Sequence, residues 1–311
     1  MKKLIIQIPC FNEEFSLPVT LKNLPKKVAG FDKVEFLIID DGSSDNTINV
    51  ANVNGVKHII SFTKNQGLAK AFMAGINESL RLGADVIINT DADNQYNAKD
   101  IPNLVKPILQ NRADIVVGAR PISSIEHFSL SKKFLQKLGS LVIRIVSNTN
   151  ISDAPSGFRA FSKDAALKLN VYSNYTYTLE TLIQAGQKNL KVVSIPISVN
   201  RDMRPSKLVK SIPSYIRRSI VTIVRIFVVY RPFRFFVSLG IFFISLGLIT
   251  SIRFIFLYQM SHIGGHIQSL ILAAILFFIG FLLVVTGFIG DLIAVNRKLL
   301  EDIQYQLRKK N

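Results

Sequence analysis

Short apolar runs alternate with amphipathic stretches over residues 1–205. Runs rich in Val and Ile that end at turn residues are typical of buried strands, whereas apolar positions spaced three and four apart are typical of helices. Because strands and helices alternate, we expect a doubly wound α/β domain. The predicted strands are 4–8, 34–39, 56–61, 86–89 and 115–118, and the predicted helices are 44–53, 68–82 and 101–110.

Two long apolar stretches follow nearer the C-terminus. Neither 235–252 nor 270–290 contains a charged residue. Each approaches the roughly 20 residues that a helix needs to cross about 30 Å of hydrocarbon. We therefore expect a transmembrane hairpin of two helices within 233–295. The alternative is a helical hairpin buried in a soluble protein.

Basic residues give the predicted hairpin an orientation. The loop 258–269 contains no Lys or Arg, whereas the outer ends are flanked by Arg231, Arg234, Arg297, Lys298, Arg308, Lys309 and Lys310. The positive-inside rule then predicts that both termini are cytoplasmic and that 296–311 is a basic cytoplasmic tail. Arg253, near the far end of the first span, is expected to extend toward the membrane surface.

A juxtamembrane segment, 206–232, joins the two parts. Within it, polar residues recur every three or four positions over 211–230, and isoleucines occupy another face. This pattern predicts an amphipathic interfacial helix with a basic face. The alternative is an amphipathic helix packed on the α/β domain.

Composition narrows the class of partner. The net charge is +17, but much of the excess flanks the apolar spans and no zinc-finger or other nucleic-acid-reading motif is present. We therefore expect anionic lipid, and not nucleic acid, as the partner. Cys10, the single cysteine, excludes an intramolecular disulfide and is expected to be a small buried side chain. No cleavable signal precedes the first strand, so the α/β domain is expected on the cytoplasmic side.

Three predicted strands end in polar residues. The first runs into PCFNEE at 9–14, the second reaches Asp40 and Asp41 in IDDGSSDNT, and the fourth runs into NTDADNQY, which contains Asp91 and Asp93. Open α/β sheets bind ligands outside the carboxyl ends of their strands. Paired carboxylates there suit Mg²⁺ or Mn²⁺ that also binds phosphate oxygens. The pattern predicts a nucleotide diphosphate site, although each motif alone could be a solvated or helix-capping turn.

The motifs PCFNEE, IDDGSSDNT, NTDADNQY and DAPSGFRAF, in this order and spacing, resemble glycosyltransferase family two. The branch that they resemble is the polyprenyl-phosphate glycosyltransferases, which include dolichyl-phosphate mannose synthases and their undecaprenyl-phosphate counterparts. The resemblance implies a GT-A fold, which is a Rossmann-like nucleotide-diphospho-sugar transferase domain. It also implies a nucleotide sugar donor, a polyprenyl phosphate acceptor, Mg²⁺ or Mn²⁺ as cofactor, and inversion at the anomeric carbon.

The resemblance assigns the donor side of the site. It implies that Asp91, Asp93 and Gln95 bind the metal with the donor diphosphate, and that Asp93 is catalytic. The nucleotide pocket that it implies contains Pro9, Asn12, Glu13, Asp40, Asp41 and Gly67. Near the membrane segment, Arg201, Ser206 and Lys207 match a pattern that closes over the diphosphate. The alternative for these three is a basic linker.

The resemblance also assigns positively charged residues to the binding of the acceptor phosphate. Family members have an arginine that binds the lipid phosphate, and Arg120 is the matching residue in this chain. The alternative is that Arg120 is a surface arginine after a strand. Lys132 and Lys133 stand where another family arginine is usual, so a two-pronged phosphate contact would become a point charge. Arg159 is expected to be an active-site cation or half of a structural ion pair, and both interpretations remain open.

A phosphate acceptor relaxes the need for a general base. A phosphate monoester, with a second pKa of roughly 6, is already anionic at neutral pH. Asp153 and Glu180 remain candidate bases, although capping or surface roles are favoured for both.

Two functions are the alternatives to a lipid-phosphate transferase. One is a processive polysaccharide synthase, whose Gln-x-x-Arg-Trp signature this Trp-free chain lacks, and the other is a non-catalytic membrane accessory protein. The identity of the nucleotide base, the identity of the sugar and the formation of a homo-oligomer stay open.

Overall fold

The structure is a computed structural model that forms two compact units, Met1–Arg217 with Gln304–Asn311, and Arg218–Ile303. It describes residues 1–121, 139–141, 143–145, 147, 149–171, 177–200, 221, 224–225, 228–260 and 267–310. Most of the predicted interfacial helix lies outside these ranges, although 228–230 are helical.

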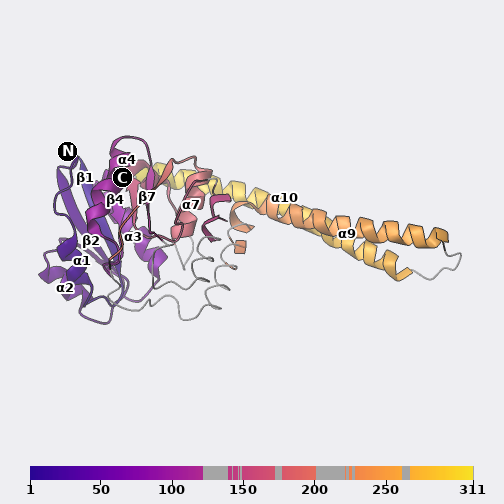
Figure 1. Ribbon diagram of the computed structural model, residues 1–311, viewed down its shortest axis with the longest axis horizontal. Coiled ribbons are helices and arrows are strands. Elements are labelled where there is room, and N and C mark those ends of the chain that lie inside the picture. Colours follow the sequence, from indigo (N-terminus) through magenta and orange to yellow (C-terminus); the bar gives the residue numbers. More distant parts are fainter. Residues whose placement is uncertain are drawn as a thin grey trace. The chain divides into compact units, whose positions relative to one another are not determined.

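A seven-stranded sheet forms the centre of the first unit, with strand order β3-β2-β1-β4-β6-β5-β7 (Figure 1). Its strands are β1 (Lys3–Cys10), β2 (Lys33–Asp40), β3 (His58–Ser61), β4 (Val86–Asn89), β5 (Ile115–Ala119), β6 (Arg159–Ser162) and β7 (Val192–Pro196). The five strands predicted from the sequence are confirmed, and β6 and β7 are additional. Strand β6 runs antiparallel to β4 and β5, whereas the other pairs are parallel. The sheet is therefore mixed.

Helices cover both faces of this sheet (Figure 1). They are α1 (Leu17–Asn23), α2 (Thr47–Val53), α3 (Leu68–Arg81), α4 (Ile101–Leu109), α6 (Lys163–Lys168) and α7 (Thr178–Gln187), with a 3₁₀ turn, η1, at Ala98–Asp100. The three predicted helices are confirmed. Helices α1, α2 and α4 share one hydrophobic core with Leu4, Ile6 and Ile8 of β1. On the opposite face, Phe72 of α3 stacks on Tyr177 with ring centroids 3.9 Å apart.

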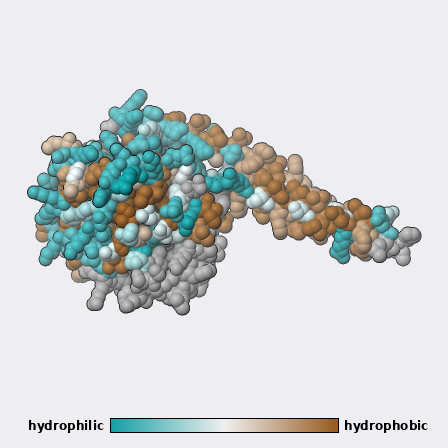
Figure 2. Space-filling model, turned by 45° about the horizontal axis from the view of Figure 1, so that its top comes forward, coloured by the Kyte–Doolittle hydropathy of each residue, from teal (hydrophilic) through white to brown (hydrophobic). Residues whose placement is uncertain are grey.

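The second unit contains helix α9 (Pro232–Met260) and most of helix α10 (Ile267–Lys310). Both are long and apolar enough to cross a membrane, and Figure 2 shows hydrophobic side chains along them. Small buried residues recur at every seventh position of α10: Ala273, Gly280, Gly287 and Ala294. A Cβ atom added at Gly240 would lie 2.8 Å from the carbonyl oxygen of Gly280, so the two helix backbones approach closely there.

The predicted basic tail is helical, because α10 continues to Lys310. Its last turns, 304–310, belong to the first unit. There the Tyr305 hydroxyl lies 3.3 Å from Asp164 Oδ1, and Arg308 Nη1 donates to the Leu169 carbonyl at 2.8 Å. Since α6 ends at Lys168, Arg308 satisfies a carbonyl at the C-terminal end of that helix.

Candidate active site

The polar strand ends meet where the strand order of the sheet reverses. Strand β1 pairs with β2 on one side and with β4 on the other, with Cys10 opposite Asp40 and Gln7 opposite Asn89. Such a switch point opens a crevice at the carboxyl ends of the strands. Because β6 is antiparallel, its first residue, Arg159, pairs with Asn89 at this same edge. The structure therefore brings the segment before β6 to the three acidic motifs.

The loops after β1 and β2 are joined by hydrogen bonds. Asn12 adopts a left-handed backbone with φ 56°, and its Oδ1 accepts the Ser44 amide at 2.9 Å. The Asn12 amide donates to Ser43 Oγ at 2.9 Å, and the Glu13 amide donates to Thr47 Oγ1 at 2.8 Å. These bonds fix the two loops as one wall of the site. Pro9, the second-last residue of β1, is buried in the sheet.

Asp40 and Asp41 each hold a neighbouring loop. Asp41 accepts the backbone amides of Gln66 and Gly67 at 2.7 and 2.9 Å, directly before α3. Asp40 accepts from Ser61 Oγ at 2.9 Å, where β3 ends. Both carboxyl groups are nearly fully buried. The loop that carries Gly67 is thereby positioned at the carboxyl edge of the sheet.

The turn after β4 carries the two candidate metal ligands. Burial, and next the charge of Asp93, raise the pKa of Asp91 to about 7, while the Tyr96 hydroxyl bonds to Asp91. Asp93 Oδ1 accepts the Gln95 amide at 3.1 Å. The turn is tied to α1, because Thr20 Oγ1 donates to the Ala92 carbonyl at 2.8 Å.

This turn fits a hard divalent cation. The charge of Asp93 disfavours the charged form of Asp91, and a bound cation would relieve that repulsion. Within the described ranges, no three His, Cys, Asp or Glu side chains gather into a metal site. A pair of carboxylates suits Mg²⁺ or Mn²⁺, which usually keeps positions for water and substrate phosphate oxygens. Asp91, Asp93 and the adjacent Gln95 are the residues that would hold it.

A buried network of polar side chains lies against the acidic turn. Asn89 Nδ2 donates to the Gly157 carbonyl at 2.9 Å and to the Tyr177 hydroxyl at 2.8 Å, and Asn89 Oδ1 accepts from Gln7 at 2.9 Å. The Gly157 amide in turn donates to the Tyr96 hydroxyl at 3.0 Å. The network thus connects β1, β4 and the segment before β6 to the hydroxyl that bonds to Asp91.

Gly157 is a point of close backbone approach in this network. A Cβ atom there would lie 2.8 Å from the Tyr177 hydroxyl oxygen and 3.2 Å from Asp91 Oδ1. The other members of the network were not predicted from the sequence: Gln7, Asn89, Tyr96 and Tyr177. The available signal was weak: Asn89 and Tyr96 are the first and last residues of NTDADNQY.

Arg120 is held by Asp153. Its Nε and Nη2 donate to the two carboxylate oxygens at 2.7 and 3.0 Å, and its backbone amide donates at 3.2 Å. Burial works against the charge of Arg120, but Tyr96, Asp153 and Asp91 together raise its pKa. Capping or surface roles were favoured for Asp153, and because it is fully buried the surface role is wrong. The same correction applies to Glu180, which is buried in α7.

Arg159 is fully buried and bonded mainly to backbone carbonyls. It donates to the carbonyls of Ser156, Ala154 and Thr178 and to Thr181 Oγ1, at 2.7 to 2.8 Å. Burial lowers its pKa to about 10. Among the described residues no carboxylate pairs with it, so the alternative of a structural ion pair is not seen, and Arg159 instead links β6 to α7 through hydrogen bonds. Its catalytic role stays a prediction.

The remaining predicted site residues lie outside the described residues: Lys132, Lys133, Arg201, Ser206 and Lys207. The chain before Arg201 does reach the acidic turn. The Asn200 amide donates to the Gln95 carbonyl at 2.9 Å, and Asn200 Nδ2 donates to the Asn94 carbonyl at 2.8 Å. The described chain therefore lies at the edge of the candidate metal site as far as Asn200.

The chain is similar in sequence to curated glycosyltransferases. The chain is 30% identical over 212 residues to an undecaprenyl-phosphate mannosyltransferase of Micrococcus luteus, covering 65% of this chain and 85% of the relative. It is 31% identical over 223 residues to a UDP-N-acetylglucosamine–dolichyl-phosphate N-acetylglucosaminyltransferase of Methanococcus voltae, covering 63% of this chain and 85% of the relative.

The fold is also found in solved structures. The chain resembles glucosyl-3-phosphoglycerate synthase of Mycobacterium tuberculosis in complex with Mn²⁺, UDP and glucosyl-3-phosphoglycerate, with a TM-score of 0.53 and 17% identity over 71% of this chain and 80% of that chain. This likeness confirms the expected GT-A fold. The model of the family described as glycosyl transferase family 2 matches residues 5–169, which is more than half of the chain. The chain therefore belongs to glycosyl transferase family 2 and is a glycosyltransferase.

Proposed function

We propose that this glycosyltransferase transfers a sugar from a nucleotide sugar to a polyprenyl phosphate, in a metal-dependent and inverting reaction at the membrane. The observation that carries the proposal is the pair Asp91 and Asp93, set at the switch point of the sheet with the Asp153-bound Arg120 acting electrostatically on Asp91. The relatives named for undecaprenyl and dolichyl phosphate support the choice of acceptor.

On the donor side, the chain supplies a prearranged nucleotide pocket. The interlocked loops at Asn12 and Glu13 form one wall, and Asp41 holds the loop of Gly67 as another. Prearranged dipoles lose little energy by reorganising when charge develops on the leaving diphosphate. When bound at Asp91, Asp93 and Gln95, a divalent cation supplies a Lewis acid that neutralises that charge.

On the acceptor side, the chain supplies a cation and needs no base. Asp153 binds Nε and Nη2 of Arg120, and Nη1 has no bonded partner among the described residues. In this proposal the Asp153 contact fixes the guanidinium plane so that Arg120 orients an anionic phosphate oxygen. Because that oxygen is already deprotonated near neutral pH, Asp153 and Glu180 have no proton to remove.

The two apolar helices fit a lipid acceptor. We propose that α9 and α10 span the membrane with both termini and the first unit on the cytoplasmic side, as the distribution of Lys and Arg favours. A polyprenyl chain then stays in the bilayer while its phosphate reaches the site. Inversion converts an α-linked nucleotide sugar into a β-linked lipid phosphate sugar.

The test uses membranes that contain the full-length protein, a panel of radiolabelled UDP- and GDP-sugars, polyprenyl phosphate, and Mn²⁺ or Mg²⁺. We expect a product that is extracted into organic solvent and is labile to mild acid. It should disappear in Asp93→Ala and persist in Glu78→Ala, because Glu78 makes only an exposed pair with Arg81. Transfer that continues without polyprenyl phosphate would overturn the acceptor, and undiminished transfer by Asp93→Ala would overturn the metal assignment.

A further inference from the structure

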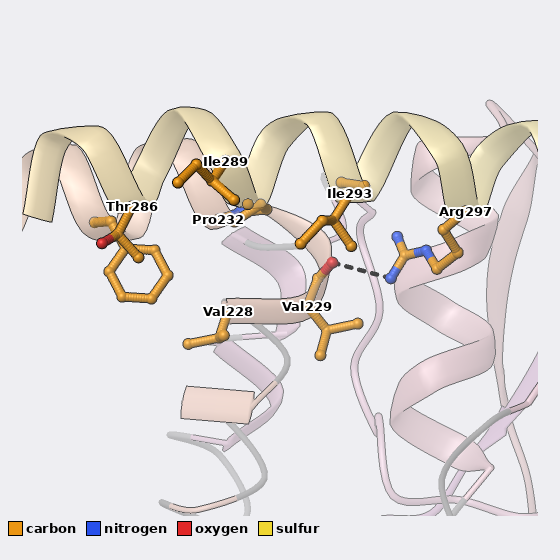
Figure 3. A pocket seen from close by; sticks show the side chains of 10 residues that line it. Val228, Val229, Pro232, Thr286, Ile289, Ile293 and Arg297 are labelled. Atoms are coloured by element: carbon orange, nitrogen blue, oxygen red, sulfur yellow. Dashed lines mark hydrogen bonds between the residues drawn. The ribbon is translucent and has the colours of Figure 1, made fainter.

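The helical unit contains an apolar pocket between the start of α9 and the later part of α10 (Figure 3). Its volume is about 330 Å³. One side is formed by Val228, Val229, Pro232 and Phe236, and the other by Ile289 and Ile293. Apolar walls of this kind suit a hydrocarbon chain, since they offer few partners for a polar ligand.

One end of the pocket is closed by Arg297, whose charge is already balanced. Its Nη1 donates to the Val229 carbonyl at 2.9 Å (Figure 3), and its Nε lies 3.5 Å from Glu301 Oε1. Its guanidinium also lies over the Tyr230 ring, 4.2 Å from the centroid. These contacts make Arg297 part of the wall, and they occupy the buried carboxylate of Glu301.

Two further arginines stand beside the pocket without such a balance. Arg231 directly precedes the pocket residue Pro232, and Arg234 lies one turn into the same helix start. Burial, and next the charge of Arg234, lower the pKa of Arg231. In the described part of this unit, neither guanidinium is paired with a carboxylate. Arg231 is half-buried and Arg234 is exposed, and two like charges so close together favour an anion as their common partner.

We propose that this is a binding site for an anionic phospholipid of the bilayer, with an acyl chain in the pocket and the phosphate bound by Arg231 and Arg234. The apolar walls favour a lipid over a free phosphate, and the arginines favour an anionic lipid over a neutral one. Basic pockets beside transmembrane helices on the cytoplasmic side bind anionic head groups in this way. All residues of this site belong to the helical unit, whereas Arg120 belongs to the first unit.

The experiment titrates the purified, delipidated full-length protein with phosphatidylglycerol or with phosphatidylcholine of the same acyl chains, and counts bound lipids by native mass spectrometry. We expect tighter binding of phosphatidylglycerol. The double variant R231Q/R234Q should bind it roughly 30-fold more weakly, as expected for the loss of two cations near a membrane surface. Phosphatidylcholine binding should change little.

Two controls separate charge from folding. R253Q removes an arginine near the far end of α9 and should keep the preference for phosphatidylglycerol. R231K/R234K should also keep most of it, because the charges remain. Equal affinities for the two lipids in the unaltered protein would overturn the proposal, as would an unchanged preference in R231Q/R234Q. Stoichiometric displacement of phosphatidylglycerol by polyprenyl phosphate would also overturn it, because the occupant would then be the acceptor.

Discussion

Arg120 and Asp153 form a two-pronged ion pair, with Nε to Oδ2 at 2.7 Å and Nη2 to Oδ1 at 3.0 Å. The Arg120 side chain is largely buried and that of Asp153 almost completely so. Removing one partner of such a pair leaves an uncompensated buried charge, which is strongly destabilising. The pair therefore has to be tested by variants that preserve as much of the charge balance as the chain allows.

Arg120→Lys should reduce transfer at least about tenfold, because a lysine keeps the charge but loses the planar two-pronged contact. We expect the KM for polyprenyl phosphate to rise and the KM for the nucleotide sugar to stay nearly unchanged. Asp153→Glu should show the same split, since it keeps the charge but shifts the guanidinium. Kinetics with each substrate varied in turn measure both, and an equal loss for donor and acceptor would contradict the acceptor role.

Gly157→Ala should reduce activity by about a hundredfold and destabilise the fold by roughly 1–3 kcal/mol. The new methyl group would lie 2.8 Å from the Tyr177 hydroxyl oxygen and 3.2 Å from Asp91 Oδ1, so the candidate metal ligand must move. Adding Tyr177→Phe should recover part of the stability. Gly139→Ala is the matched control, because nothing lies within 4 Å of its added Cβ. Equal activity in the two single variants would contradict this account of the site.

The local pattern predicted the elements that position the acidic motifs. Strand β4 was predicted with its observed bounds, and the motifs after β1, β2 and β4 converge as expected. The prediction succeeded because buried parallel strands are continuous apolar runs that stop at polar turns. Strand β6 was missed because it is only RAFS, and its first residue is a buried arginine that hydropathy counts as polar.

Contacts between distant parts of the chain could not be read from local spacing. Gln7 and Asn89 bond across two paired strands, and Gly157 meets Tyr96 from the segment before β6. These partners become neighbours only once the antiparallel position of β6 is known. The hydrogen bonds of Arg159 have the same origin, because its acceptors come from the preceding loop and from α7.

Gly280→Leu should separate helices α9 and α10. A Cβ atom at Gly280 would already lie 2.5 Å from Ile244 Cγ1 and 2.9 Å from the Gly240 carbonyl oxygen, so a leucine cannot fit without moving a backbone. We expect a clear drop in the thermal unfolding temperature of the detergent-solubilised protein. Phe281→Leu, at an exposed neighbouring position, is the control. Matching unfolding temperatures for the two variants would contradict the close packing.

Glu35 should contribute stability that is lost in acid. Although burial opposes its charge, hydrogen bonds from Lys3 and Lys33 lower its pKa to about 2. A lowered pKa in the folded state stabilises the fold above the unfolded pKa of about 4.3, and this stabilisation fades as the pH falls from there through about 2. Glu35→Gln should flatten the pH dependence of the unfolding free energy in that window. An equally steep profile in the variant would contradict the assignment.

Arg308→Ala should release the end of α10 from α6. In the native protein, Arg308 Nη1 donates to the Leu169 carbonyl at 2.8 Å, and the Tyr305 hydroxyl lies 3.3 Å from Asp164 Oδ1. Loss of the charged donor leaves a helix-terminal carbonyl without its partner, at a cost of about 1–2 kcal/mol. We expect faster hydrogen exchange in residues 304–310 and at the end of α6, measured by mass spectrometry.

The control for this prediction is Lys310→Ala, which removes a positive charge from the same turn at an exposed position. Because no carbonyl of α6 is assigned to Lys310, its exchange pattern should match that of the unaltered protein. Tyr305→Phe should give an intermediate increase, since the Arg308 contact remains while the longer bond to Asp164 is lost. If exchange in residues 304–310 were equally fast in all four proteins, the last turns of α10 would not be held by α6, and the basic tail would behave as the sequence alone suggests.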